Sequence, residues 1–128
     1  MDLILVFPGQ GSQKPGMARD LADAFPAAKR AIDDADAALG VEGARLSSLM
    51  FDGPADALTL THNAQPALLA HGAMLWAALG ETLRPRVRAT AGHSLGEFTA
   101  HHAAGSLSLA DAVRLVRARG DLMYRSGV

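Results

Sequence analysis

Residues Gly92 to Gly96 read GHSLG, so a serine stands midway between two glycines. This G-x-S-x-G spacing is typical of a nucleophile elbow, a sharp strand-to-helix turn that exposes a serine hydroxyl. The glycines suit such a turn because they lack Cβ and leave room for close backbone approach. The N–H of Leu95 is the donor that this geometry predicts for an oxyanion. Covalent catalysis through Ser94 is one interpretation, and a small-residue turn without chemistry is the other.

A second glycine-rich run, FPGQGSQ, extends from Phe7 to Gln13 after a short apolar segment. Its glutamines Gln10 and Gln13 either serve a reacting group or hold the loop through backbone hydrogen bonds. A nucleotide-binding loop does not fit, because Lys14 stands where G-x-G-x-x-G needs its third glycine. The phosphate-binding pattern G-x-x-x-x-G-K-[ST] fails as well.

The elements that must position these two runs follow from apolar patterning and turn residues. The apolar runs 3–7 and 87–92 predict two buried parallel strands. Asn63 is a predicted N-cap, with Pro66 in the first turn of a helix that is apolar on most faces and therefore central. Ser108 is predicted to cap the last helix. The predicted helices cover about 16–24, 26–39, 46–51, 54–58, 63–79, 95–104 and the residues that follow Ser108.

Strand, helices, strand, helix is an α/β pattern, here rich in helix with about two parallel strands. Parallel sheets need several neighbouring strands and cover on both faces, so two strands form an unfinished sheet. The exposed edge of that sheet is expected to favour self-association or pairing with a second chain. The 128 residues fit a single unit.

Composition excludes several classes of function. With 49% hydrophobic and 20% charged residues the chain is globular, and its net charge of −1 gives no footprint for nucleic acid. The absence of cysteine removes disulfides, thiolate metal sites and a cysteine nucleophile, and no metal site is predicted. No segment reaches the roughly 18 apolar residues of a spanning helix, so we expect no membrane partner and a cytoplasmic protein.

Two further runs accompany the elbow and the first loop: THNAQPALL at 61–69, and ADAVRLV at 110–116 leading to Arg119 and Gly120. Taken together, these four runs resemble the malonyl-CoA:acyl-carrier-protein transacylase family, which includes the acyltransferase domains of fatty-acid and polyketide synthases. The resemblance extends over essentially the whole chain. The pathway and the extender unit stay open at this point.

The resemblance implies that Ser94 takes a malonyl group from malonyl-CoA and passes it to the phosphopantetheine thiol of acyl carrier protein. It also implies that Gln10 and the N–H of Leu95 form the oxyanion hole, and that Arg119 binds the free carboxylate of the malonyl group. A planar guanidinium suits that task because it can donate two parallel hydrogen bonds to a carboxylate. Malonyl-CoA is then a substrate, and no cofactor is expected.

The family's architecture is an α/β-hydrolase-like large subdomain with an inserted ferredoxin-like small subdomain. By resemblance, residues 1–128 are the N-terminal part of the large subdomain, and the small subdomain is absent. The family's catalytic histidine stands well downstream of its serine and matches none of the histidines here. We therefore expect this chain to be inactive alone. The histidines are His62, His71, His93, His101 and His102.

Alternatives stay open for individual residues and for the function. Arg119 has the sequence context of a solvated helix arginine, like Arg114 and Arg117. Gln65 either supports the site residues from behind or only caps and packs, and capping and packing is the favoured interpretation. A serine hydrolase or thioesterase would use the same elbow with water as acceptor. A non-catalytic fragment that pairs with a second chain is the alternative from another class.

Overall fold

Two short strands and seven α-helices make up residues 1–40 and 43–127, the part of the chain that the computed structural model describes. The strands are β1 (Leu3–Phe7) and β2 (Val87–Gly92). The helices are α1 (Arg19–Ala24), α2 (Pro26–Leu39), α3 (Leu46–Asp52), α4 (Ala55–Thr59), α5 (Thr61–Leu83), α6 (Leu95–Ala103) and α7 (Leu109–Arg125), with a 3-10 turn, η1 (Arg84–Arg86), between α5 and β2. The predicted helix-rich α/β class is confirmed.

The two strands pair in parallel, with Leu3 opposite Val87 at one end and Phe7 opposite Gly92 at the other. Because the carboxyl ends of parallel strands meet at one edge of a sheet, the loop after β1 lies beside the turn after β2. The N–H of His93 donates to the carbonyl of Phe7 over 3.2 Å and joins the two segments. The sheet therefore brings the two glycine-rich runs of the sequence together.

The prediction that both strands are buried is wrong for one face of the sheet. Leu5 and Phe7 are partly covered, whereas the alternate residues Ile4 and Val6 have exposed fractions of 67% and 74%. A continuous apolar run is typical of a strand covered on both sides. In the described part of the chain, helices cover one side only, so β1 has the composition of a buried strand and the exposure of a half-covered one.

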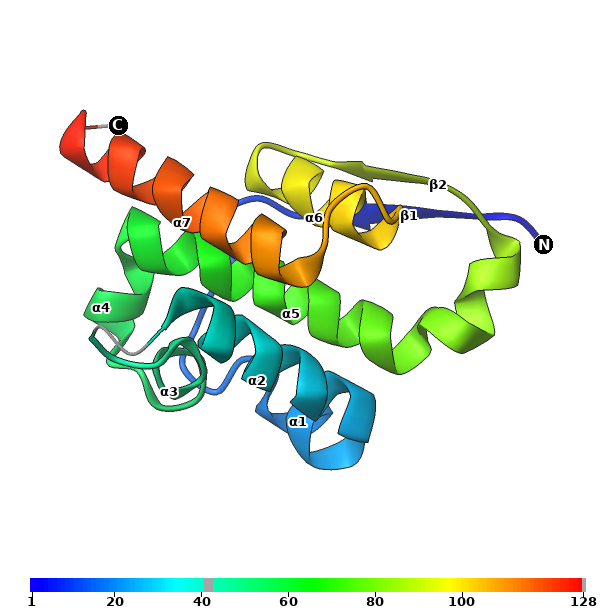
Figure 1. The fold of residues 1–128 in the computed structure, drawn as a ribbon, viewed down its shortest axis with the longest axis horizontal. Coiled ribbons are helices and arrows are strands. Elements are labelled where there is room, and N and C mark those ends of the chain that lie inside the picture. The colour runs from blue at the N-terminus through cyan, green and yellow to red at the C-terminus, as the bar shows by residue number, and fades with distance from the viewer. Residues whose placement is uncertain (41–42, 128) are drawn as a thin grey trace.

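Helix α5 is the centre of the molecule, with α7 along one side and α2 along the other (Figure 1). The prediction of a central, buried helix here is confirmed, and its residues from Ala64 to Ala70 are all buried. Full burial of one large apolar side chain contributes about 1.5–3 kcal/mol. The largest fully buried apolar side chains are Ile32, Leu46, Met50, Leu58, Leu69, Met74, Leu95, Val113 and Val116.

The ends of α5 differ from the prediction. The helix begins at Thr61 rather than after Asn63, so Pro66 lies inside it, where its ring crowds the carbonyl four residues earlier and cannot donate a hydrogen bond to it. The helix does not end at Gly80 but continues to Leu83. A single glycine does not by itself end a helix when the residues around it favour helix. This longer helix places Thr61 and Gln65 on its first two turns.

Other predicted ends are confirmed. Pro26 occupies the first turn of α2, and Gly40 follows its last residue with a positive φ of 78°. The hydroxyl of Ser108 accepts a hydrogen bond of 3.1 Å from the N–H of Asp111, which caps α7. Such a cap is typically worth about 1 kcal/mol.

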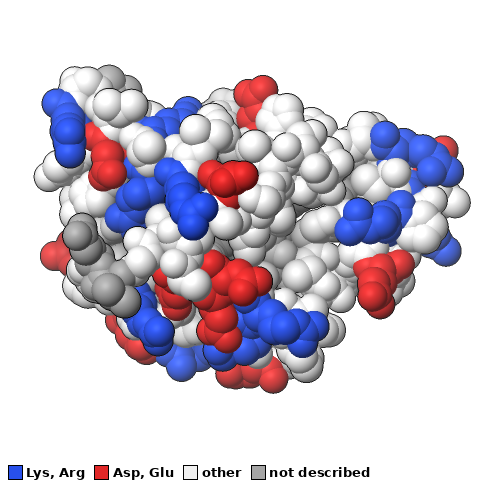
Figure 2. Space-filling model, viewed as in Figure 1, with Lys and Arg blue, Asp and Glu red and all other residues white. Residues whose placement is uncertain are grey.

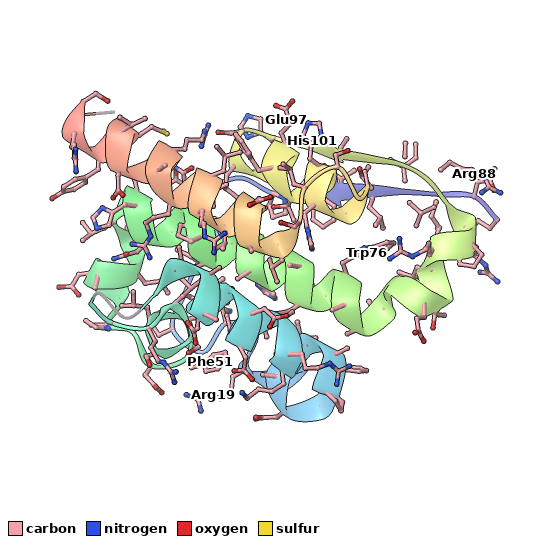
Figure 3. The ribbon with its side chains drawn as sticks, viewed as in Figure 1. Arg19, Phe51, Trp76, Arg88, Glu97 and His101 are labelled. Atoms are coloured by element: carbon pink, nitrogen blue, oxygen red, sulfur yellow. The ribbon has the colours of Figure 1, made fainter. Side chains whose placement is uncertain are left out.

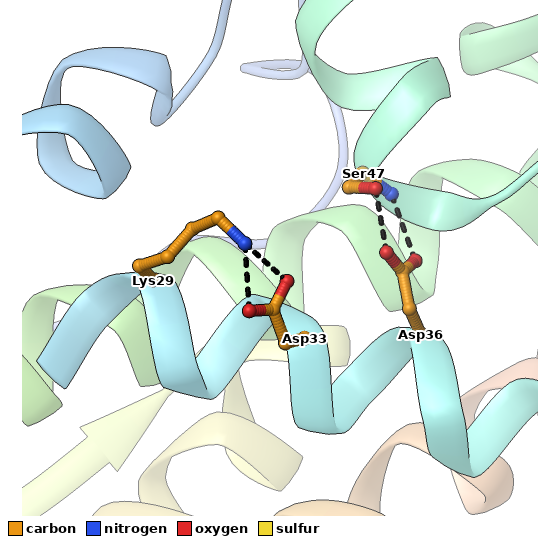
Figure 4. A network of polar contacts seen from close by, with 4 residues as sticks. All are labelled: Lys29, Asp33, Asp36 and Ser47. Atoms are coloured by element: carbon orange, nitrogen blue, oxygen red, sulfur yellow. Dashed lines mark hydrogen bonds and ion pairs between the residues drawn. The ribbon is translucent and has the colours of Figure 1, made fainter. Parts of the chain in front are cut away.

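A buried carboxylate connects α2 to α3. Asp36, only 9% exposed, accepts hydrogen bonds from the N–H of Ser47 at 3.0 Å and from its hydroxyl at 2.5 Å (Figure 4). The neighbouring pair Lys29–Asp33 is exposed and spaced four residues apart on one helix, so it contributes only about 0.3–0.5 kcal/mol. The carboxylate of Asp36 is therefore the polar contact that fixes these two helices.

Positive and negative side chains are interspersed on the face shown in Figure 2. This distribution agrees with the small net charge of −1. In the described ranges 1–40 and 43–127, each helix is too short or too polar to cross a lipid bilayer.

Candidate active site

Ser94 lies at the turn between β2 and α6, where the sequence predicts an elbow. Its backbone has φ 54° and ψ −115°, a region that non-glycine residues rarely adopt and that costs of order 1–3 kcal/mol. A Cβ on Gly92 would lie 2.0 Å from the backbone of Gly96, and a Cβ on Gly96 would lie 2.2 Å from the carbonyl of Phe7. Glycine is therefore required at both positions of the G-x-S-x-G run.

The donors around the turn agree with an oxyanion site. The N–H of Gly96 donates to the carbonyl of His93 at 2.9 Å, and the N–H of Glu97 donates to that of Ser94 at 3.1 Å. In the described part of the chain, the N–H of Leu95 is thereby left as the first open donor of α6. The positive end of the helix dipole adds to its potential.

The first loop touches the elbow at Gly9, where a Cβ would lie 3.0 Å from the carbonyl of His93. The side-chain amide of Gln10 donates a hydrogen bond to the Oγ1 of Thr61 over 3.1 Å. Gln13 accepts a hydrogen bond of 2.9 Å from the N–H of Gly11 and so holds the loop from within. The loop is thus fixed both to itself and to the start of α5.

The side chain of Arg119 reaches Ser94 from α7. Its Nη2 donates to the Oγ of Ser94 at 3.1 Å, and its Nη1 donates to the Oε1 of Gln65 at 2.6 Å. The guanidinium carbon also lies 5.4 Å from the centre of the Phe98 ring, within the range of a cation–π contact. The alternative that Arg119 is merely solvated is therefore wrong, since it is half-buried and bonded on two sides.

Arg114 and Arg117, which precede Arg119 on α7, bond to groups other than Ser94. Arg114 is exposed, and its Nε donates to the carbonyl of Ala38 at 3.1 Å. Arg117 is half-buried and donates to the Oδ1 of Asn63 at 2.9 Å. Burial lowers the pKa of Arg117 from its ordinary value, and the nearby Asp121 opposes that shift.

Gln65 is the site residue that sequence reasoning underestimated. Its side chain is fully buried, and it contacts Arg119 through its oxygen and the sulfur of Met123, 3.2 Å away, through its nitrogen. One signal was available, because Gln65 is an amide in a helix segment whose other side chains are almost all apolar. A buried polar group needs partners, and the sequence alone does not say where α7 supplies them.

The histidines of the chain all contact groups other than the Ser94 hydroxyl in the described structure. His93 lies against Gly9, His62 makes an edge contact with Tyr124 at 4.8 Å, and His102 is 3.0 Å from the carbonyl of Leu107. His101 lies beside Glu97 on the outer side of α6 (Figure 3). His71 lines an apolar groove between β1 and α5. Among residues 1–40 and 43–127, no general base contacts Ser94.

A groove of about 340 Å³ lies between β1 and α5 and does not include the elbow. Its lining is largely apolar and comes from residues such as Leu5, Phe7, Leu68, His71 and Trp76. Burial lowers the pKa of the His71 imidazole, and the carboxylate of Asp20 opposes that shift. Within the described residues, no group of three or more histidine, aspartate or glutamate side chains is arranged to hold a metal ion.

The fold and the site define a helix-rich α/β protein with a serine at a strained strand-to-helix turn and an arginine bonded to its hydroxyl. Comparison with known proteins gives the family. The acyl transferase domain family matches residues 4–127, and the chain belongs to it.

Curated relatives include bacterial malonyl CoA-acyl carrier protein transacylases. The chain is 50% identical over 122 residues to the protein of Bacillus subtilis (strain 168), which covers 94% of this chain and 37% of the relative. It is 43% identical over 121 residues to the protein of Escherichia coli (strain K12), covering 94% of this chain and 38% of the relative. The chain thus spans well under half the length of these relatives.

Solved structures agree. The acyl-carrier-protein-S-malonyltransferase of Bartonella henselae superimposes with a TM-score of 0.90 at 44% identity, over 100% of this chain and 40% of that one. A malonyl-transacylase solved in complex with a type II polyketide acyl-carrier protein gives a TM-score of 0.89 at 40% identity, over 98% of this chain and 40% of that one. These matches confirm the resemblance predicted from the four sequence runs.

Proposed function

We propose that this chain carries the nucleophile, the oxyanion donors and the carboxylate clamp of a transacylase that moves malonyl groups from coenzyme A to acyl carrier protein. The names of its relatives support that reaction. The observation that carries the assignment to these residues is the 3.1 Å contact between the guanidinium of Arg119 and the Oγ of Ser94. A hydrolase of neutral acyl groups has no use for a cation at that place.

In the first half-reaction, the Oγ of Ser94 attacks the thioester carbonyl of malonyl-CoA and loses its proton to a general base. The N–H of Leu95 and the loop that carries Gln10 stabilise the tetrahedral oxyanion, and one such donor is worth about 3–4 kcal/mol. The carbon–sulfur bond then breaks, and the leaving coenzyme A thiolate takes up the proton. The product is malonyl-Ser94.

In the second half-reaction, the phosphopantetheine thiol of acyl carrier protein attacks the ester carbonyl of malonyl-Ser94. Its proton passes through the base to the departing Ser94 oxygen, and the new thioester leaves on the carrier. Throughout both steps Arg119 holds the free carboxylate of the malonyl group, which keeps the acyl carbon in front of the oxyanion donors.

The base is proposed to come from polypeptide outside residues 1–128, so that this chain alone does not turn over. Two observations support this view: no histidine of the described residues contacts Ser94, and the relatives are more than twice as long. The outer face of the sheet, with Ile4 and Val6, is the proposed contact surface for that polypeptide or for a second copy of the chain.

The experiment that tests this proposal separates acylation from transfer. The purified chain is incubated with malonyl-CoA and phosphopantetheinylated acyl carrier protein, with and without a polypeptide that supplies the rest of the acyltransferase fold. We expect transfer only in the completed protein and none with Ser94→Ala. Rapid turnover by the chain alone would refute the external base, whereas hydrolysis of malonyl-CoA without transfer would favour the thioesterase alternative.

Substitution of the clamp tests substrate class. In the completed protein, Arg119→Ala should reduce kcat/KM for malonyl transfer about tenfold to a hundredfold, because one charged hydrogen-bond donor is worth about 1.5–3 kcal/mol. Acetyl transfer should lose much less, since an acetyl group has no free carboxylate. Equal losses for the two acyl groups would refute the assigned role.

A further inference from the structure

The first two turns of α5 contact both halves of the candidate site. Gln65 bonds to Arg119 at 2.6 Å, and Thr61 accepts the side-chain amide of Gln10 at 3.1 Å. Residues four apart lie on the same face of a helix, one above the other. A single stretch of helix therefore holds the carboxylate clamp and the oxyanion loop at a fixed separation.

The burial of Gln65 makes its contact specific. The side chain has no exposed surface, and its amide nitrogen is 3.2 Å from the Met123 sulfur, so the amide oxygen is oriented toward Arg119. With Nη1 held in this way, the guanidinium plane is set and Nη2 is directed at Ser94. Because the amide is neutral, it orients the guanidinium without cancelling the positive charge that a carboxylate needs.

We propose that Gln65 and Thr61 are positioning residues for a carboxylate-bearing acyl substrate, and that Gln65 sets the orientation of the Arg119 clamp. This inference rests on the proposed function of Ser94 and Arg119. Neither residue reacts with substrate. Gln65 acts through Arg119, and Thr61 acts through the Gln10 loop.

The molecule contains a matched pair that serves as a control. Asn63 and Arg117 also connect α5 to α7 by an amide-to-guanidinium bond, of 2.9 Å, two residues earlier on each helix. In the described residues, that bond involves neither Ser94 nor Gln10. Loss of either bond weakens the contact between α5 and α7, but only loss of the Gln65 bond releases the clamp.

The test uses NMR spectra of the chain with labelled arginine, together with titrations of malonyl-CoA and acetyl-CoA. In the native chain, the Nη protons of Arg119 should give separate signals because both nitrogens are bonded. Gln65→Met keeps the size of the side chain and removes the acceptor, so these signals should merge. Asn63→Leu should leave the Arg119 signals separate.

Binding supplies the second readout. Gln65→Met should weaken malonyl-CoA binding about tenfold and leave acetyl-CoA binding unchanged, which a merely structural role would not do. Gln65→Glu should keep the Arg119 signals separate and still weaken malonyl-CoA binding, because the new carboxylate competes for the guanidinium. If Gln65→Met does not fold, Gln65→Glu decides alone.

Two outcomes would overturn the inference: separate Arg119 signals in Gln65→Met, or equal changes in malonyl-CoA and acetyl-CoA binding across the variants. Failure of the proposed function appears differently. In that case the native chain shows no preference for malonyl-CoA, while the NMR signals still report whether Gln65 orients Arg119. Thr61→Val completes the series and should disturb the amide signals of the Gln10 loop without merging those of Arg119.

Discussion

The helical side of this molecule and its sheet differ in how completely they are covered. In the packing of α2, α5 and α7, side chains such as Ile32, Leu69 and Val116 have no exposed surface. On the sheet, Ile4 and Val6 are 67% and 74% exposed. Ser94 stands between the two, at the end of β2 and the start of α6.

This difference separates the covered part of the candidate site from the exposed sheet face beside it. Arg119 and Gln65 come from α7 and α5, and both are held in place by hydrogen bonds inside the covered region. On the open side, the sheet face exposes two apolar side chains, Ile4 and Val6, which form the contact surface proposed above. Arg119, the proposed carboxylate clamp, thus lies on the covered side of the molecule, whereas the proposed contact surface for further polypeptide lies on the exposed side.

The largest effect on stability is expected from Gly96→Ala, because Gly96 lies where α6 packs against the end of β1. A Cβ there would lie 2.2 Å from the carbonyl oxygen of Phe7, and backbone cannot move away cheaply. We expect a loss of at least about 3 kcal/mol or failure to fold, as measured by thermal unfolding. Gly105→Ala is the control, because its positive φ of 87° strains alanine but nothing lies within 4 Å. Similar losses in the two variants would contradict the clash.

A second pair of substitutions compares the two sides directly. Leu69→Ala in α5 should cost about 2–5 kcal/mol, since the leucine is fully buried. Val6→Thr on the outer face of the sheet should change the free energy of unfolding by less than about 0.5 kcal/mol. Urea unfolding of both variants provides the measurement. A large loss in Val6→Thr would mean that the outer face is already covered in solution by a second copy.

A smaller effect is expected at Ser94 itself. Ser94→Gly should raise the free energy of unfolding by about 0.5–1 kcal/mol, because glycine adopts the positive φ of 54° without strain. Ser94→Ala keeps the Cβ and should show no such gain, although both variants lose the hydroxyl. If both variants are equally stable in urea unfolding, the backbone of the elbow stores no strain.

Much of the site was predictable because its parts are local. The strand at Val87–Gly92, the turn at Ser94 and the cap at Ser108 depend on residues close in sequence, and the structure places them as predicted. Exact ends of α5 were harder, because Asn63 and Pro66 are good helix starters that tertiary packing overrides.

Long-range contacts account for what the sequence did not show. The bond from Gln65 to Arg119 joins residues 54 apart, and nothing near Gln65 in sequence specifies that partner. The exposure of Ile4 and Val6 could not be predicted either. An apolar run indicates a strand suited to burial on both faces, but it does not show whether other residues cover both faces. The resemblance suggested the proposed role of Arg119, and only the structure shows its hydrogen bonds to Gln65 and Ser94.

The smallest effect concerns pH and His71, which lies in the groove between the two sides. Burial lowers the pKa of His71 below its ordinary value of 6.5. The unfolded chain therefore binds this proton at a higher pH than the folded chain, so stability is retained above pH 6.5 and falls as the pH drops below it. His71→Gln removes the titration and should flatten this part of the curve by less than the change expected for Ser94→Gly. The measurement is urea unfolding of both proteins on either side of that pH, and identical slopes would show that the groove does not desolvate the imidazole.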